Sequence, residues 1–420
     1  MARDESAEPL SGPAEVSGRR PRTPTTIAVV LAGLAVIAAV IWSTFQGPAG
    51  QPGPGSTTAG GTTSTGVTTS TAPPTSSVTS APSTPGVAPT GDADATAPKV
   101  TVDPRGAVSA ADVPYLLDRT LHTGSRTVSY TFDPPFAYVP LAEGKAVIVE
   151  NNIGTSTGDR AQLADATGRT VATVQARPEH TLLAMANDAG TQYALLDVPV
   201  DMKGTNGVLT LYDGTGAKRL TRTGVPEDLR PAGFVGDRLF LGNWETAGTF
   251  VWDLGSNRVS RYAVGVVAVS TSESSGRVAF TRLADYEKPR CATVSDVRGS
   301  KPVPVSTTCG QFSATELSKD GRYLLGIRVP SDGSLQSPSR VIDVTTGRPL
   351  VYLESQPMNI ESHFMADGSV GLNVYVSTGG APRNTIMRCT LDGQCSPMVQ
   401  TLPMPDYDQT LATRYTLVRQ

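Results

Sequence analysis

The sequence is poor in charged residues, and one long segment has none. Charged residues make up 17% of the 420 residues, below the quarter that is usual for soluble domains. No ionisable side chain occurs between Arg22 and Asp92. The low charge therefore comes largely from this uncharged middle, which separates a short N-terminal tail from a large C-terminal region.

The chain also lacks a basic excess. Its formal net charge is −3 at pH 7. The arginines and carboxylates of residues 1–24 balance, and Asp92 and Asp94 carry two of the three net negative charges, which leaves about −1 for residues 99–420. Binding to a phosphate backbone requires a basic surface. The composition therefore argues against a nucleic-acid partner.

Groups for acid–base or metal chemistry are scarce. The three histidines, His122, His180 and His363, are scattered in or beside expected strands, where a packed or surface role is ordinary. Residues 154–158 match the G-x-S-x-G nucleophile motif, which requires a strand–turn–helix junction, yet here another strand follows. We expect no catalytic residue, metal or cofactor, although carboxylates drawn from distant loops stay an open alternative.

Residues 25–45 form an uncharged apolar run of the length that crosses a bilayer. Arg19, Arg20 and Arg22 precede it and no basic residue follows before Lys99, which predicts a cytoplasmic N-terminus. A cleaved signal peptide is the alternative, but it would have a shorter apolar region followed by a small-x-small site. We therefore expect a cytoplasmic tail at 1–24, a transmembrane helix at 25–45 and an extracytoplasmic remainder in the cell membrane.

Residues 46–98 consist almost entirely of Ser, Thr, Gly, Pro and Ala with scattered Val. Such a composition buries too little apolar surface to offset the entropy of ordering, so we expect a disordered, flexible linker. The remaining residues, 99–420, are expected to form the folded domain.

A repeat with a period near 45 residues runs through this domain. A glycine-containing turn followed by a short apolar strand recurs every 40 to 47 residues, at Gly144, Gly190, Gly236, Gly276, Gly321 and Gly368. A strand that ends in Asp before a turn recurs in phase with it, at Asp165, Asp213, Asp253, Asp296, Asp343 and Asp392. Glycine and aspartate suit such turns because they tolerate left-handed backbone angles or bond their own main chain.

Each unit then holds four antiparallel strands, which is the blade of a β-propeller. Six units cover residues 136 to about 402, and each end of the region reads as half a blade. We expect the N-terminal half-blade to supply an Asp-type strand pair and the C-terminal one to supply the Gly-type strand region. The sequence thus predicts an all-β, seven-bladed propeller with its last blade shared between the termini, with six or eight blades as alternatives.

The turns resemble those of bacterial surface propellers of the TolB-like and YVTN-type families. The resemblance rests on LSKDGRYLLG (Leu317–Gly326) and IDVTTG (Ile342–Gly347), and it implies a fold rather than an activity. The layout is also similar to that of actinobacterial membrane-anchored propellers whose outer domain opens with a Pro-Tyr-Leu segment, here VPYLLDRTLH (Val113–His122).

Four cysteines lie in the expected exterior domain, where an even number favours disulfides. Of three possible pairings, we favour Cys291 with Cys309 and Cys389 with Cys395, because each pair joins nearby strands. A zinc site is the alternative, but the spacing fits no zinc finger.

Long, varied loops between second and third strands, together with the connectors between blades, gather at one end of such a propeller and form its default binding surface. From these loops we select candidate ligand- or partner-binding residues: Trp244, Glu245, Tyr286 and Arg290, with Glu227, Arg230, Asn359 and Glu361 nearer the channel mouth.

The resulting hypothesis is a monomeric, membrane-anchored, non-enzymatic binding module that contacts an envelope, cell-wall or protein ligand. A propeller hydrolase or lyase with a site in the central channel is the alternative. A sensor that signals inward is disfavoured by the short tail.

Overall fold

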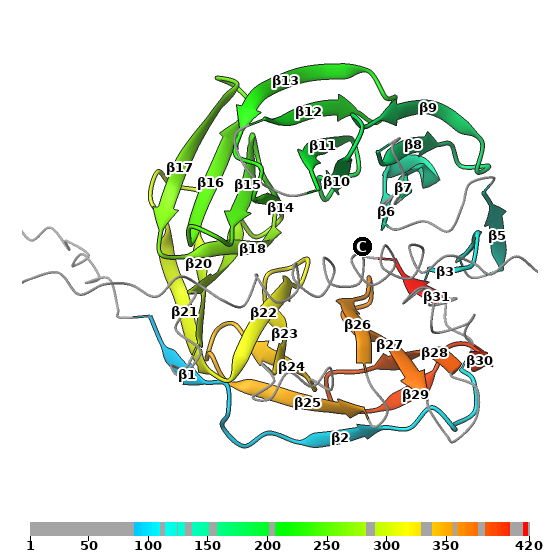
Figure 1. Ribbon diagram of the computed structural model, residues 1–420. Coiled ribbons are helices and arrows are strands. Elements are labelled where there is room, and N and C mark those ends of the chain that lie inside the picture. Colours follow the sequence, from blue (N-terminus) through cyan, green and yellow to red (C-terminus); the bar gives the residue numbers. More distant parts are fainter. Residues whose placement is uncertain are drawn as a thin grey trace, which may run out of the picture. The chain divides into compact units, whose positions relative to one another are not determined.

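Seven β-sheets stand radially around a common axis in the computed structural model (Figure 1), and their innermost strands line a central channel. The structure describes residues 88–109, 114–123, 125–130, 137–150, 158–200, 206–282, 290–328, 338–355, 359–376, 383–403 and 415–418. The predicted tail, transmembrane segment and most of the predicted linker lie outside these residues. No helix within the described residues is both long and apolar enough to cross a membrane.

Blades 1 to 6 each contain four consecutive antiparallel strands, ordered from the channel outward. Blade 1 comprises β6 (Ala137–Pro140), β7 (Ala146–Glu150), β8 (Arg160–Ala164) and β9 (Thr170–Gln175). Blade 2 comprises β10 (His180–Ala186), β11 (Gln192–Pro199), β12 (Gly207–Asp213) and β13 (Lys218–Val225). Blade 3 comprises β14 (Leu229–Val235), β15 (Arg238–Asn243), β16 (Gly248–Asp253) and β17 (Arg258–Val264). A single 3-10 turn, η1 (Ala142–Gly144), separates β6 from β7.

Blade 4 comprises β18 (Val267–Ser272), β19 (Arg277–Arg282), β20 (Arg290–Asp296) and β21 (Val303–Gly310). Blade 5 comprises β22 (Phe312–Leu317), β23 (Tyr323–Arg328), β24 (Ser339–Asp343) and β25 (Pro349–Ser355). Blade 6 comprises β26 (Asn359–Phe364), β27 (Val370–Val376), β28 (Arg383–Cys389) and β29 (Cys395–Pro397). A short strand, β30 (Leu402–Pro403), also pairs with β28.

The repeated turns are formed as the sequence predicted. All six repeat glycines have positive φ, between 56° and 79°, which favours a residue without Cβ. In the turn between the third and fourth strands of a blade, the repeat aspartate binds the main chain. Asp213 Oδ1, for example, accepts the N–H groups of Thr215 and Ala217 at 2.9 and 3.0 Å. These local turns set the blade period.

Burial decreases from the middle strands to the rim. Every residue of β7 is buried, whereas β13 buries only Val225. The hydrophobic clusters lie between neighbouring blades, as where β11 and β12 of blade 2 pack on Leu239, Leu241 and Trp252 of blade 3. Because each blade needs a neighbour to cover its apolar face, the ring must close.

Blade 7 closes the ring with strands from both ends of the domain. The C-terminal β31 (Tyr415–Leu417) is innermost and pairs antiparallel with β3 (Tyr115–Leu117), followed by β4 (Thr120–Thr123) and β5 (Arg126–Ser129). The sequence predicted a pair of strands from the N-terminal segment, whereas that segment supplies three. Asp118, with φ of 51°, begins a two-residue turn that folds β3 onto β4 as an additional strand.

A segment that we call the rim strap, residues 88–109, runs along the outside of the ring (Figure 1). Its strand β1 (Thr90–Asp92) adds in parallel to β21 of blade 4, and β2 (Lys99–Val102) adds in parallel to β25 of blade 5. At its end, the Ser109 N–H donates to the Pro397 carbonyl in blade 6 at 2.8 Å.

The strap is packed as well as paired. Ala93 is fully buried between blades 4 and 5, and Val102 is buried between blades 5 and 6. The buried Arg340 guanidinium donates to Asp94 Oδ1 at 2.7 Å and to the Ala93 carbonyl at 2.9 Å. Residues 88–98, which the sequence assigned to the linker, therefore belong to the folded domain. Alternation of apolar side chains, the usual signal of a strand, is too short here to reveal them.

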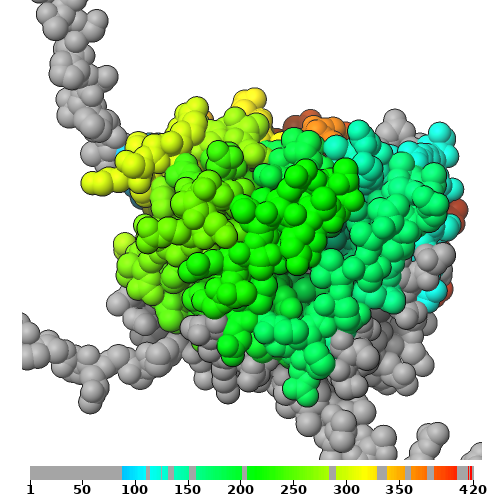
Figure 2. All heavy atoms as spheres, turned by 90° about the horizontal axis from the view of Figure 1, so that it is seen from above, coloured from blue at the N-terminus to red at the C-terminus, as the bar shows by residue number. Residues whose placement is uncertain are grey.

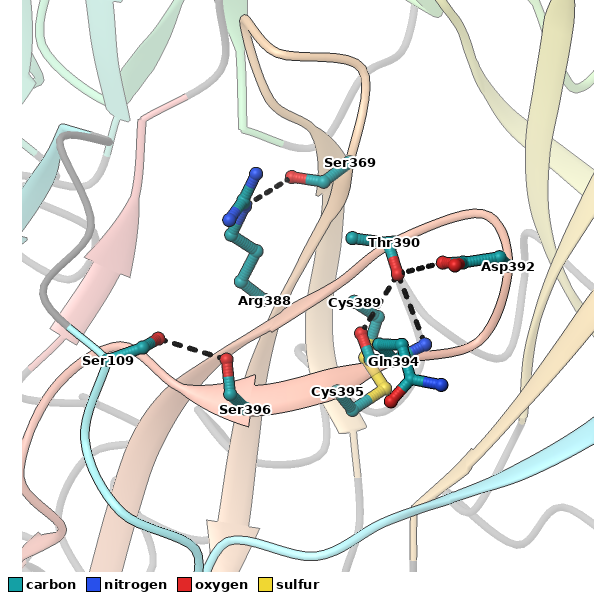
Figure 3. Close-up of a disulfide and its surroundings, with 9 residues drawn as sticks. All are labelled: Ser109, Ser369, Arg388, Cys389, Thr390, Asp392, Gln394, Cys395 and Ser396. Atoms are coloured by element: carbon teal, nitrogen blue, oxygen red, sulfur yellow. Dashed lines mark hydrogen bonds between the residues drawn. A yellow bond between two sulfur atoms is a disulfide. The ribbon is translucent and has the colours of Figure 1, made fainter.

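Both predicted disulfides are present. Cys291 is bonded to Cys309 across β20 and β21, and Cys389 to Cys395 across β28 and β29. The second disulfide cross-links the hairpin whose turn contains Asp392 (Figure 3). Next to it, the hydroxyl of Ser109 in the strap is hydrogen-bonded to the hydroxyl of Ser396. Each disulfide thus joins directly opposed residues of an antiparallel pair.

Candidate functional site

The central channel contains a cavity of about 590 Å³, within the size range of small-molecule pockets. Each of the seven innermost strands contributes to its wall. Representative residues, one from each blade in order, are Val139, Met185, Ala232, Thr271, Glu316, His363 and Leu417. The cavity reaches the end of the channel where the repeat-glycine turns lie, beside Lys145, Asp188 and Lys319.

Three charged side chains meet on one side of this cavity. His363 Nδ1 lies 2.8 Å from Glu316 Oε2, and its Nε2 lies 2.9 Å from Glu361 Oε1. Glu316 belongs to β22 of blade 5, whereas Glu361 and His363 are two residues apart on β26 of blade 6 and so share a face. We call these three residues the channel triad.

The triad also reaches the strand that closes the ring. Glu361 Oε2 accepts the Leu417 N–H of β31 at 3.3 Å. Glu316 Oε2 also accepts the Phe364 N–H at 3.3 Å. Blades 5, 6 and 7 are therefore linked through one imidazole and two carboxylates.

The two carboxylates govern the protonation of His363. Burial alone would lower the pKa of this imidazole, but the charge and hydrogen bond of Glu316 and those of Glu361 outweigh it and raise the pKa to about 9. The side chain is an imidazolium at neutral pH, and both ring nitrogens donate. It therefore holds a charge in place and has no free nitrogen to accept a proton as a general base.

The wall facing the triad is mostly apolar and built of small side chains, such as Ala137, Ala184 and Ala232. The side chains of Glu361 and His363 are 31% and 23% exposed. The cavity thus combines an apolar wall with the charged triad on one side and with Lys145, Asp188 and Lys319 at its turn end. Within the described residues, no cluster of three or more His, Cys, Asp or Glu side chains is arranged to hold a metal.

A carboxylate brace joins two turns at the same end of the channel. The Asp188 N–H donates to Glu273 Oε2 at 2.8 Å, and the Glu273 N–H donates to Asp188 Oδ2 at 3.1 Å. These turns belong to blades 2 and 4, and they meet although blade 3 lies between them in the ring. The turn of blade 3 permits this because Gly236 and Asp237 alone separate β14 from β15. Burial and the nearby Asp188 charge raise the pKa of Glu273, against the Asp188 N–H bond that lowers it.

Among the residues selected from the sequence, only Glu361 belongs to the channel triad. Trp244 is half-buried and Glu245 exposed in the β15–β16 loop, and Arg290 is half-buried at the start of β20. Tyr286 lies outside the described residues. The backbone of Asn359 pairs with Val374 at the start of β26, and its side chain is not among those described.

Glu227 lies on the connector into blade 3 and Arg230 at the start of β14, at the end of the channel opposite the turns. Glu227 is fully buried, and its Oε1 accepts the Asn206 N–H at 2.8 Å, while Oε2 has no hydrogen-bond partner among the residues that the structure describes. Burial lowers the pKa of Arg230, against the charges of Asp228 and Glu245. Arg230 donates to the Leu229 carbonyl at 3.0 Å.

A second histidine, His180, lies near this loop end. His180 Nδ1 lies 2.6 Å from Asp197 Oδ1. Arg177 Nε lies 3.3 Å from the other oxygen of the same carboxylate. A carboxylate that orients an imidazole through Nδ1 is the arrangement found in general bases.

Sequence reasoning missed the roles of Glu316 and His363. Each lies five residues before its repeat glycine, Gly321 and Gly368, so they occupy equivalent positions on successive innermost strands. Aligning the repeats and comparing this position would have placed both residues on the channel wall. His363 was instead considered alone, without its repeat partner.

Comparison with known proteins assigns no family to this chain. No family model and no curated protein sequence matches the chain. Among solved structures, it is similar to Kuenenia stuttgartiensis hydrazine synthase (16% identity, TM-score 0.40, 53% of this chain and 66% of that chain) and to TolB from Acinetobacter baumannii (14%, 0.37, 69% and 63%). It is also similar to the β-propeller domain of the trilobed protease from Pyrococcus furiosus (13%, 0.41, 64% and 84%). The chain spans less than two thirds of the length of the first two proteins.

Proposed function

We propose that the chain is a membrane-anchored envelope protein whose propeller binds a ligand in its central channel without transforming it. Residues 25–45 serve as the anchor, residues 1–24 stay in the cytoplasm, and the propeller stands outside. The Cys291–Cys309 and Cys389–Cys395 disulfides support an oxidising location.

The observation that carries the proposal is that both ring nitrogens of His363, in the channel triad, are bound to carboxylates. The cavity has the size of a ligand pocket, yet the one histidine on its wall uses both nitrogens to bind carboxylates. The His363 imidazole is already protonated at neutral pH, because its pKa is about 9. It therefore places a fixed charge on the cavity wall. The geometry supports recognition of a ligand more than acid–base chemistry.

The proposal is tested with the full chain reconstituted in nanodiscs. Envelope extract from the source cells is passed over wild-type protein and over a Glu361→Gln variant, which keeps the shape of the wall and removes a charge. A component retained by the wild type and lost by the variant supports a channel ligand. Equal retention by both would place binding elsewhere, and retention of nothing by either would contradict a binding module.

An enzyme is the second candidate, and the His180–Asp197 pair is the observation that favours it. We test it with chromogenic esters and glycosides, comparing wild type with His180→Gln. Turnover that His180→Gln abolishes, while thermal unfolding is unchanged, would replace the binding proposal. Topology is checked separately: an N-terminal tag should be protected from protease in intact cells, and the propeller should be labelled by a membrane-impermeant reagent.

A further inference from the structure

The rim of blades 2 and 3 is basic although the chain as a whole is acidic. Their outermost strands carry five exposed cations and no carboxylate: Lys218, Arg219 and Arg222 on β13, and Arg258 and Arg261 on β17. Of these five, only Arg219 forms an ion pair with a described carboxylate, that of Asp213 at 2.5 Å. Formal net charge of the whole chain is −3, so these charges are segregated on one part of the surface.

Two of the arginines lie on the facing sides of the two blades. Arg222 pairs in register with Leu209, and Arg261 with Phe250. Leu209 and Phe250 both belong to the apolar cluster between blades 2 and 3. Their cross-strand partners therefore lie on the side of each sheet that faces the neighbouring blade. The Arg261 guanidinium also lies 5.3 Å from the centre of the Phe250 ring.

β13 and β17 are the outer edges of their sheets within the described residues. The two blades come together where Asn257 Nδ2, in the turn before β17, donates to the Thr221 carbonyl of β13 at 3.1 Å. Figure 2 views the rim from the side on which these blades lie, with their residues in adjoining green and yellow-green. An outer edge exposes backbone N–H and C=O groups that can pair with another strand.

The rim strap shows what such an edge accepts in this protein. It adds an extended segment in parallel to β21 of blade 4, crosses to blade 5, and adds to β25. One of its three aspartates, Asp94, is bound between these blades by Arg340. Backbone pairing on two neighbouring edges, joined by a carboxylate–arginine contact between them, is thus already built into the ring.

We propose that the rim of blades 2 and 3 binds an extended acidic peptide by strand addition to β13 and β17, with its carboxylates on Arg222 and Arg261. A peptide fits better than a glycan or a lipid surface because only a peptide backbone can satisfy the edge of a sheet. This surface lies on the outside of the ring and is independent of the channel ligand.

The probe is a fluorescein-labelled (Thr-Asp)5 peptide, titrated with full chain in nanodiscs of neutral lipid and followed by anisotropy at low salt. We expect binding that weakens as salt rises, weaker binding of the neutral (Thr-Asn)5, and no binding of the basic (Thr-Lys)5. The Arg222→Gln/Arg261→Gln variant should bind the acidic peptide roughly three- to twentyfold more weakly, the effect of losing two exposed ion pairs. The matched control, Arg282→Gln/Lys301→Gln, removes two exposed cations of blade 4 and should bind as wild type does.

A second probe separates strand addition from charge attraction. The same peptide, methylated on alternate backbone nitrogens, keeps its carboxylates and cannot pair with an edge on that side. It should lose most of its binding. Equal binding of the methylated peptide, tighter binding of inorganic polyphosphate through the same two arginines, or no binding of (Thr-Asp)5 to the wild type would each overturn the proposal. Equal thermal unfolding of all variants shows that the edge itself is intact.

Discussion

Glu316 and His363 occupy the same position on successive innermost strands, and Oε2 of one lies 2.8 Å from Nδ1 of the other. The repeat therefore places a carboxylate of blade 5 directly against an imidazole of blade 6. Glu361 binds the other ring nitrogen and, through Leu417, the strand that closes the ring. Glu361 therefore both lines the channel cavity and bonds to β31, the strand that closes the ring.

The first prediction concerns the pH dependence of stability. The pKa of His363 is about 9 in the folded protein against 6.5 for the free side chain. Because the folded value is raised, the stabilisation is fully present below about pH 6.5 and is lost as the pH rises through 9. His363→Gln should remove this dependence and cost on the order of 3 kcal/mol at pH 6.

Urea unfolding at pH 6, 8 and 10 measures the effect. His122→Gln, on β4, provides the control and should keep the decline of the wild type. If His363→Gln lost stability with pH as steeply as the wild type, the triad would not be the source of the dependence.

The second prediction concerns the grip of Arg340 on the strap. Asp94→Asn removes the carboxylate from a guanidinium that is only 7% exposed. It should lower the free energy of unfolding by about 1–3 kcal/mol, because the remaining charge is buried with less compensation. The Arg340 guanidinium lies 4.9 Å from the centre of the Tyr352 ring. This cation–π contact remains in the variant and limits the loss of stability.

Asp103→Asn is the matched control, since Asp103 pairs with Arg105 on the exposed surface of the same strap. Unfolding of that variant should match the wild type. Equal destabilisation by the two changes would show that Arg340 has no special part in holding the strap.

The third prediction tests how closely the strap approaches the ring. A Cβ added at Gly91 would lie 1.8 Å from the Gly347 carbonyl oxygen. Gly91→Ala must therefore displace β1, and we expect a loss of about 1–3 kcal/mol, as for other overpacked sites. Amide exchange at residues 90–92 should rise in step.

Gly255→Ala supplies the comparison, because the nearest atom to its added Cβ is 3.7 Å away. Exchange in the strap should be unaffected by that change. Protection of residues 90–92 that survived Gly91→Ala would contradict the close packing of β1 on blade 5.

The fourth prediction orders the two disulfides by loop length. Cys291 and Cys309 are 18 residues apart, and Cys389 and Cys395 are 6 apart. In the chain-entropy account, removing the first by Cys→Ala changes costs about 3 kcal/mol and removing the second about 2 kcal/mol. Denaturation of the two double variants, with single-cysteine variants as controls for lost packing, measures the order. A larger loss for the 389–395 pair would show that burial of Cys389 outweighs chain entropy.

Much of the ring was predictable because its signals are local. A positive-φ glycine at Gly190 or a self-capping aspartate at Asp213 is chosen by its own turn, so the sequence records each one. Counting these turns yields the blades, and the cysteine pairings follow because each pair closes a hairpin. The three-strand contribution of the N-terminal segment was missed because the turn at Asp118 is two residues long and contains no glycine.

The channel triad and the rim strap were decided by the tertiary structure. Glu316 and His363 are 47 residues apart and become neighbours only when the ring brings successive innermost strands together. Residues 90–98 have little strand character of their own, and β1 pairs only because β21 presents an unpaired edge and Arg340 presents a buried charge. The sequence alone determined the repeated unit, since a turn depends on its own few residues. The surfaces that can bind a partner depended on closure of the ring, because only closure brings distant repeats into contact.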